Sequence, residues 1–155
     1  MNAIQHFDIF WYGPFDDADN EVLQDENLVL YMLAGTHGLY GKGVPLYIGK
    51  TLRTVKTRVS EHNWIRHEPD PVRIYAAAIS PPFEQWSEVM TVESYPPLDD
   101  KLVTQIESLL IYAHQPVYNA RSKGDRRTAP GNICLFNTGR RATLYPEVSS
   151  LYWYR

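Results

Sequence analysis

Two short apolar runs on either side of a glycine-rich stretch constrain the fold more than any other part of this 155-residue chain. The first run, 27–33 (NLVLYML), has the length of a β-strand, and the second is 45–49 (PLYIG). The stretch between them (AGTHGLYGKG) contains four glycines, which suit a loop. Strand, loop and strand in direct succession predict an antiparallel hairpin with a long connection.

Other segments carry weaker signals of secondary structure. Segment 51–66 contains no glycine or proline and places two valines four residues apart, which predicts a helix. Segment 72–80 is bounded by prolines and predicts a strand, as does 132–137. Segment 98–114 has an apolar stripe at helical spacing with acidic residues at its start, and predicts the clearest helix. Segment 81–97 fits either a short helix followed by a strand or one irregular element.

This order of elements predicts an α/β fold with a small, mostly antiparallel central sheet of three strands, flanked by helices. The length suits a single domain over 1–155, with its core at about 28–119. Residues 1–26 mix aromatic and acidic side chains and are expected to form an N-terminal arm. Residues 121–155 are expected to form a basic, aromatic C-terminal extension.

The distribution of charge changes what the net charge of −3 implies. An acidic total argues against a nucleic-acid partner, because Lys and Arg contacts to phosphate supply most of the affinity for such ligands. Residues 1–41, however, hold seven acids and no Lys or Arg, so the remaining 114 residues carry 15 bases against 11 acids. The bases concentrate in 50–66 and 121–141. These segments are either phosphate-contacting surfaces or solvated faces.

Cysteine and hydropathy patterns bear on the compartment. The single cysteine, Cys134, excludes an internal disulfide and, with no recognisable histidine spacing, makes a zinc site an unfavourable interpretation. No apolar run approaches the roughly 18 residues needed to span a bilayer. We therefore expect no membrane partner and a cytoplasmic location.

A set of polar residues lies on the predicted elements in an order that suits hydrolysis of a phosphodiester, which needs a base, a charge stabiliser and usually a metal ion. The predicted hairpin carries Tyr31 on its first strand and Tyr47 on its second. Arg58 and His62 lie four residues apart and share a face of the predicted helix. Glu107 flanks the apolar stripe of the late helix, so it is expected to be either a metal ligand or an ion-pair partner.

These residues resemble the motifs of the GIY-YIG nuclease family. The resemblance rests on the segment YIGKT (47–51), on the arginine and histidine four apart, on a glutamate in an IE-x-LLI helix, and on Asn119 in P-x-YN. It covers about 28–119. The first motif departs from the family, since VLY at 29–31 stands for GIY. A second tripeptide, GLY at 38–40, lies too close to YIG, so Tyr31 is the preferred counterpart.

The resemblance implies a role for each residue. Glu107 would bind one Mg²⁺ or Mn²⁺, Tyr31 would deprotonate the attacking water, and Arg58 would stabilise charge on the phosphate. Tyr47 and His62 would orient the phosphate and the nucleophile. Residues expected to contact the nucleic acid are Lys50, Asn119, Arg121, Lys123, Arg126 and Arg127.

The expected function is a metal-dependent endonuclease that hydrolyses phosphodiester bonds, most often in double-stranded DNA, in a restriction, toxin or repair setting that the sequence leaves open. A homodimer is a possible assembly because duplex cutting commonly uses two-fold symmetry. The alternative is a catalytically inactive module that binds nucleic acid or protein. Retention of Tyr47, Arg58, His62 and Glu107 together favours the enzyme.

Overall fold

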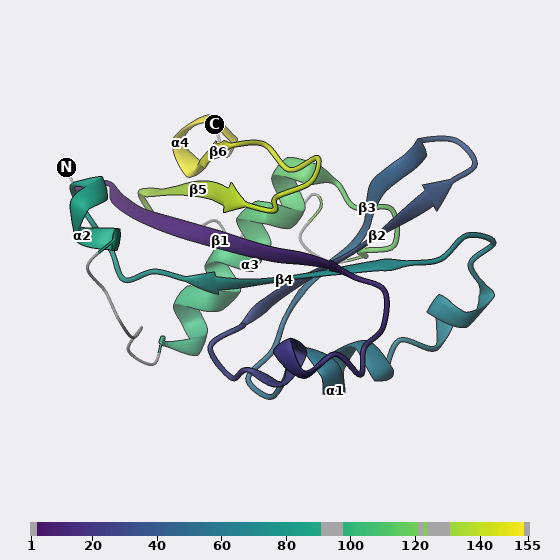
Figure 1. Cartoon of the computed structure of the whole chain (residues 1–155). Helices are drawn as coiled ribbons and strands as arrows, with labels where there is room; N and C mark the ends of the chain where they lie inside the picture. The colour runs from purple at the N-terminus through teal and green to yellow at the C-terminus, as the bar shows by residue number, and fades with distance from the viewer. Residues whose placement is uncertain (1–2, 91–97, 121–122, 124–130, 154–155) are drawn as a thin grey trace.

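The computed structural model describes residues 3–90, 98–120, 123 and 131–153 (Figure 1). Strands and helices alternate irregularly along the chain, and two short 3₁₀ turns, η1 and η2, join them. In chain order the elements are β1 (Gln5–Phe15), η1 (Glu21–Gln24), β2 (Leu30–His37), β3 (Gly41–Lys50), α1 (Val55–Ser60), η2 (Asn63–His67), β4 (Arg73–Ile79), α2 (Trp86–Met90), α3 (Asp100–His114), β5 (Ile133–Gly139), β6 (Glu147–Ser149) and α4 (Ser150–Trp153).

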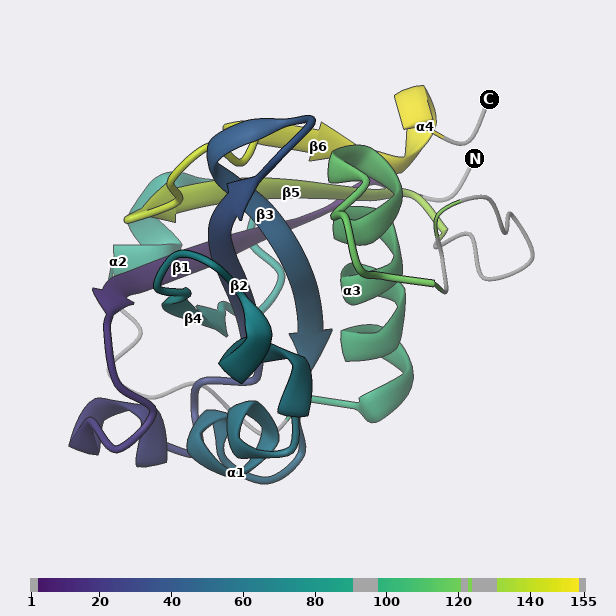
Figure 2. The same ribbon diagram turned by 90° about the vertical axis from the view of Figure 1, so that its right-hand side faces the viewer.

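The strands form one six-stranded sheet in the order β3-β2-β4-β1-β5-β6. Neighbouring strands are antiparallel except β1 and β5, which run parallel, so the sheet is mixed. The sheet curls strongly, and β1 and β5 run across the direction of β2 and β3 (Figure 2). The prediction of a small three-stranded sheet flanked by helices is therefore wrong. Strands β2, β3 and β4 are present and adjacent, but they make only half of the sheet.

The N-terminal segment is the main reason for this correction. It was expected to be an arm, yet β1 lies inside the sheet between β4 and β5. Alternate side chains of β1, namely Phe7, Ile9 and Trp11, are fully buried in the core. The Trp11 indole N–H donates to Asn137 Oδ1 at 2.9 Å, which ties β1 to β5. The acidic residues that suggested an arm lie mostly after this strand.

The C-terminal extension also contributes to the sheet. Strand β5 (Ile133–Gly139) overlaps all but the first residue of the predicted strand at 132–137, and β6 pairs with it. Leu135, Leu144 and Val148 are fully buried, so much of this segment belongs to the core. Residues 121–122, 124–130 and 154–155 of the extension lie outside the described residues.

The predicted hairpin is confirmed by the antiparallel pairing of β2 with β3, but its long connection is wrong. The strands extend into the glycine-rich stretch and leave only 38–40 as the turn. The pairing of the two strands is irregular at two places, since the register shifts between Leu33 and Ala34 and again between Gly35 and His37. Gly41 and Gly43 have positive φ angles, which glycine adopts without strain.

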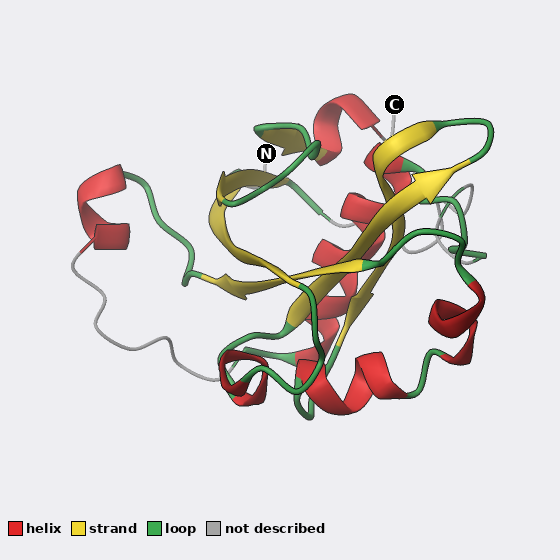
Figure 3. Cartoon of the chain, turned by 45° about the vertical axis from the view of Figure 1, so that its right-hand side comes forward, coloured by secondary structure: helices red, strands yellow, loops and turns green. Residues whose placement is uncertain are grey.

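Only a few helical segments lie against the sheet: α3 packs on one face, and the short helix α1 and the turn η1 pack on the other (Figures 2 and 3). Helix α3 packs in a cluster with Leu30 and Met32 of β2. Tyr31 and Leu33, which point to the opposite face of the same strand, pack with residues of α1 and η1. Because side chains on both faces of β2 are buried, nearly every residue of this strand is apolar.

The helices differ in how well their bounds were predicted. Helix α3 begins after Asp99, whose side chain accepts from the Lys101 N–H, and it ends at Gln115 in the left-handed conformation. This agrees with the prediction at 98–114. Helix α1 covers only Val55–Ser60 of the predicted 51–66. In 81–97, the short helix is present as α2, and the part where a strand could follow it, 91–97, lies outside the described residues. Among the described helices, none is long and apolar enough to cross a membrane.

Candidate functional site

The register of the β2–β3 hairpin places Tyr31 directly opposite Gly49. The Tyr31 side chain is fully buried and lies against the Gly49 backbone. A Cβ atom built on Gly49 would lie 2.6 Å from both the Cζ and the hydroxyl oxygen of Tyr31, well inside van der Waals contact. Glycine at this position is therefore what allows the Tyr31 ring to occupy its place.

Gly49→Ala is accordingly expected to push the Tyr31 ring away and to destabilise the protein by about 1–3 kcal/mol, as overpacked cores do. Gly38→Ala is the matched control, because a Cβ at Gly38 meets nothing within 4 Å. The control should stay within about 0.5 kcal/mol of the parent. Urea unfolding measures both, and equal stability of the two variants would contradict the packing argument.

Tyr31 is hydrogen-bonded to His62, with 2.8 Å between the hydroxyl oxygen and Nε2. Tyr47, from the neighbouring strand, completes an aromatic cluster: its ring centroid lies 5.9 Å from that of Tyr31 and 4.5 Å from that of His62. His62 does not share a helix face with Arg58, because α1 ends at Ser60. Its backbone N–H still donates to Val59 O at 3.1 Å, which holds the turn against the end of the helix.

Burial and charge set the protonation of this pair. Burial raises the pKa of Tyr31 well above its ordinary value, Tyr47 raises it further, and Arg58 opposes the shift. Burial and the Arg58 charge hold the pKa of His62 below its usual range. Tyr31 is therefore protonated and His62 neutral at pH 7. A neutral imidazole can accept the Tyr31 hydroxyl proton at Nε2.

Arg58 is partly buried and acts on both Tyr31 and His62. Its Nη1 donates to Glu61 Oε2 at 2.6 Å, and its side chain is about one-third exposed. Burial lowers the pKa of Arg58, but Tyr31 and Glu61 raise it, and the net shift is upward. A permanently charged group beside a buried tyrosine is suited to stabilising negative charge on a bound oxyanion.

Glu107 projects from α3 toward the end of β3. Its Oε1 accepts a hydrogen bond from the Lys50 backbone N–H at 3.1 Å. Within the described part of the chain, Oε2 has no hydrogen-bond partner. Burial raises the pKa of Glu107, whereas the charges of Lys50 and Arg58 lower it. This half-shielded carboxylate thus has an oxygen available for a cation.

Lys50 does not pair with Glu107 through its ammonium group. The Lys50 Nζ instead lies 2.6 Å from Asp100 Oδ1, at the start of α3. The sequence interpretation did not include Asp100, although its position seven residues before Glu107 on one helix was a usable signal. Lys50 remains three-quarters buried and close to the candidate site.

Asn119 has a structural position. Its Oδ1 accepts from the Ile48 N–H and its Nδ2 donates to the Ile48 carbonyl, both at 2.9 Å. The adjacent Tyr118 N–H donates to Leu46 O at 2.8 Å, so this segment lies along the outer edge of β3. Asn119 thereby positions the strand that carries Tyr47, and its predicted contact with phosphate stays a prediction.

The predicted basic contacts are only partly described. Lys123 directs its Nζ to the Val117 carbonyl at 3.3 Å. Arg121, Arg126 and Arg127 lie outside the described residues.

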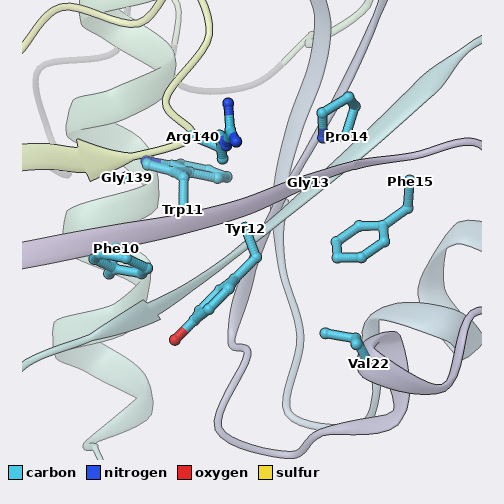
Figure 4. Close-up of a pocket in the computed structure, with 9 residues that line it drawn as sticks. All are labelled: Phe10, Trp11, Tyr12, Gly13, Pro14, Phe15, Val22, Gly139 and Arg140. Atoms are coloured by element: carbon cyan, nitrogen blue, oxygen red, sulfur yellow. The ribbon is translucent and has the colours of Figure 1, made fainter.

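A shallow hollow elsewhere on the molecule has no residue in common with this cluster. It is formed mainly by the end of β1, and Figure 4 shows Tyr12, Phe15 and Val22 around it. Its lining residues include no acid or histidine, and Arg140 is its one charged side chain. The groups with acid–base chemistry are therefore those around Tyr31, not those of the hollow.

Two further charged residues of the cluster were missed by sequence reasoning. Arg53 and Glu61 are joined by an ion pair of 2.6 Å, and Glu61 also contacts Arg58. The count of bases in 50–66 included Arg53, but no pattern linked it to a partner.

No protein-family model, curated protein or solved structure matches this chain.

Proposed function

We propose that the protein is a metal-dependent endonuclease that hydrolyses phosphodiester bonds of nucleic acid, with double-stranded DNA as the expected substrate. One observation carries the proposal. The Tyr31–His62 hydrogen bond and the Glu107 carboxylate come from separate segments of the chain, and the Arg58 guanidinium acts on the pKa of Tyr31, of His62 and of Glu107. A proton acceptor, a permanent cation and an available carboxylate are the parts that this reaction needs.

The resemblance of 28–119 to the GIY-YIG family supports the same proposal. The six-stranded sheet is not the small architecture which that resemblance implied, so the support comes from the residues and their proximity. Among the described residues, no three His, Cys, Asp or Glu side chains converge. A site with one carboxylate is nevertheless compatible with Mg²⁺, which commonly keeps several waters and is bound by one or two carboxylates plus substrate phosphates.

Glu107 fits such an ion because its Oε2 lacks a hydrogen-bond partner among the described residues while its Oε1 is held by Lys50 N–H. A bound Mg²⁺ or Mn²⁺ supplies a Lewis acid that stabilises charge on phosphate oxygens. The Lys50 backbone contact fixes the orientation of the carboxylate. The same contact lowers the pKa of Glu107 and so partly offsets the effect of burial.

The protein's own groups account for proton transfer and charge. In the proposed reaction, Tyr31 takes a proton from the attacking water as it passes its own hydroxyl proton to His62 Nε2, along the observed 2.8 Å contact. This route avoids a free tyrosinate, which the raised pKa of Tyr31 disfavours. Arg58 stabilises the charge that develops on the phosphate oxygens. Tyr47 keeps the Tyr31 and His62 rings in position.

The second candidate is a catalytically inactive module that binds nucleic acid or protein. One observation favours it: the Tyr31 side chain is 0% exposed, so water does not reach its hydroxyl in this conformation. An enzyme must therefore expose this group when substrate binds. Activity measurements separate the two candidates directly.

The assay that tests the proposal incubates purified protein with linear duplex DNA, single-stranded DNA and RNA, in Mg²⁺ or EDTA. We expect cutting of duplex DNA in Mg²⁺ and none in EDTA. Discrete fragments would favour a restriction role, and a smear would favour a toxin or general nuclease. Binding without cutting of any substrate would favour the inactive module. The proposal also includes a homodimer and a cytoplasmic location. Light scattering on the DNA-bound complex tests whether the protein is a dimer.

A further inference from the structure

Arg53 and Arg58 converge on one carboxylate at the rim of the candidate site. Arg53 Nη2 lies 2.6 Å from Glu61 Oε1, and Arg58 Nη1 lies 2.6 Å from Glu61 Oε2. Each guanidinium thus holds a different oxygen of the same group. Two arginines that grip two oxygens of one anion match the way in which guanidinium groups bind phosphate.

This arrangement is not explained by stability alone. The side chains of Arg53 and Glu61 are 56% and 41% exposed, and exposed ion pairs contribute little to folding. Both arginines lower the pKa of Glu61, so the carboxylate stays charged at neutral pH. The cluster is therefore a partly exposed contact between fully charged groups.

Local hydrogen bonds fix the backbone of the segment that carries the two arginines. The Arg53 N–H donates to Thr51 Oγ1 at 2.9 Å, and the Thr54 side chain caps α1 by accepting from the Thr57 N–H at 3.2 Å. Arg58, one turn into that helix, also acts on Tyr31. An anion held by both guanidiniums would consequently lie beside the groups proposed to do the chemistry.

We infer that Arg53 and Arg58 form a binding site for one backbone phosphate of the nucleic acid, and that Glu61 occupies this site in the free protein. The inference rests on the proposed function, since it names a contact of that same substrate. Phosphate displaces Glu61 from the two guanidiniums when the duplex binds. Glu61 is then a competitor for substrate, and Arg53 is a binding residue.

The test measures binding of a fluorescein-labelled 20-base-pair DNA duplex by fluorescence anisotropy over a range of KCl. All proteins carry Glu107→Gln, so that cutting does not interfere. Arg53→Gln should weaken binding roughly tenfold at low salt and reduce the slope of log Kd against log[KCl] by about one. Glu61→Gln should tighten binding by roughly threefold to tenfold, because the competing anion is lost.

The controls use a second ion pair, whose arginine is as exposed as Arg53. Arg73 is 55% exposed and lies 3.5 Å from Asp16, so Arg73→Gln and Asp16→Asn remove the same charges away from the site. Circular dichroism checks that every variant is folded. Equal binding by the Arg53 and Arg73 variants, or weaker binding by Glu61→Gln, would overturn the inference while leaving the nuclease proposal standing. Absence of duplex binding by the parent at every salt concentration would overturn both.

Discussion

Glu107→Gln is expected to remove Mg²⁺-dependent cutting while leaving the protein folded. Glutamine keeps the shape of the side chain and its contact with the Lys50 N–H but removes the charge that would bind the cation. Charge stabilisation by a metal ion amounts to several kcal/mol, and each 1.36 kcal/mol corresponds to about tenfold in rate. We therefore expect a loss of about 10³-fold or more in kcat/KM.

The stability of this variant provides an independent check. Because burial raises the pKa of Glu107, the ionised carboxylate is partly desolvated in the folded protein. Glutamine relieves that cost, so thermal melting should be unchanged or slightly higher, as is common when a functional group is removed. Glu26→Gln, at an exposed position, removes one negative charge outside the site and should keep full activity. If a folded Glu107→Gln protein still cut DNA, the assignment of Glu107 as the metal ligand would be contradicted.

Tyr31→Phe is expected to lower kcat by about 10²–10⁴-fold, the usual contribution of general acid–base catalysis. The substitution removes only the hydroxyl group that contacts His62 and leaves the ring packed against Gly49. Duplex affinity should therefore change little. Tyr40→Phe, at an exposed tyrosine in the hairpin turn, is the control and should behave like the parent.

The hydrogen-bonded pair of Tyr31 and His62 also predicts how cutting depends on pH. His62 must be neutral to accept the proton, and its pKa lies below the ordinary value of about 6.5. Activity is thus present above that lowered pKa and is lost as the pH falls through it. Protonation of Glu107, whose pKa is raised, acts in the same direction. Because the pKa of Tyr31 is raised, ionisation of Tyr31 causes no loss of activity up to about pH 10. Cutting that increased on acidification would contradict this scheme.

Local patterns were sufficient for several elements. The apolar runs around the glycine-rich stretch predicted the β2–β3 pair, and the capping aspartate with its apolar stripe predicted α3. These signals are short in range, since they depend on neighbouring residues and on turn chemistry. The choice of Tyr31, Tyr47, Arg58, His62 and Glu107 as candidate residues rests on the family resemblance and stays a prediction.

Other features followed from contacts between distant parts of the chain. Helix α1 was predicted too long because propensity does not show where His62 must turn back to meet Tyr31. Asn119 was interpreted as a substrate contact, whereas it completes the edge of β3 through Ile48. The space at Gly49 for the Tyr31 ring depends on the register of two strands, which the tripeptide YIG alone does not specify.

The sequence by itself thus determined where the locally encoded elements lie, and it supplied the candidate residues whose chemistry stays a prediction. Only the tertiary structure decided that β1 is an inner strand paired in parallel with β5, and that Arg53 and Arg58 share Glu61. Trp11 and Asn137, which join β1 to β5, are 126 residues apart in the chain. Pairing over such a distance is selected by burial of alternate side chains on a common core, and this collective packing energy is not carried by any local segment.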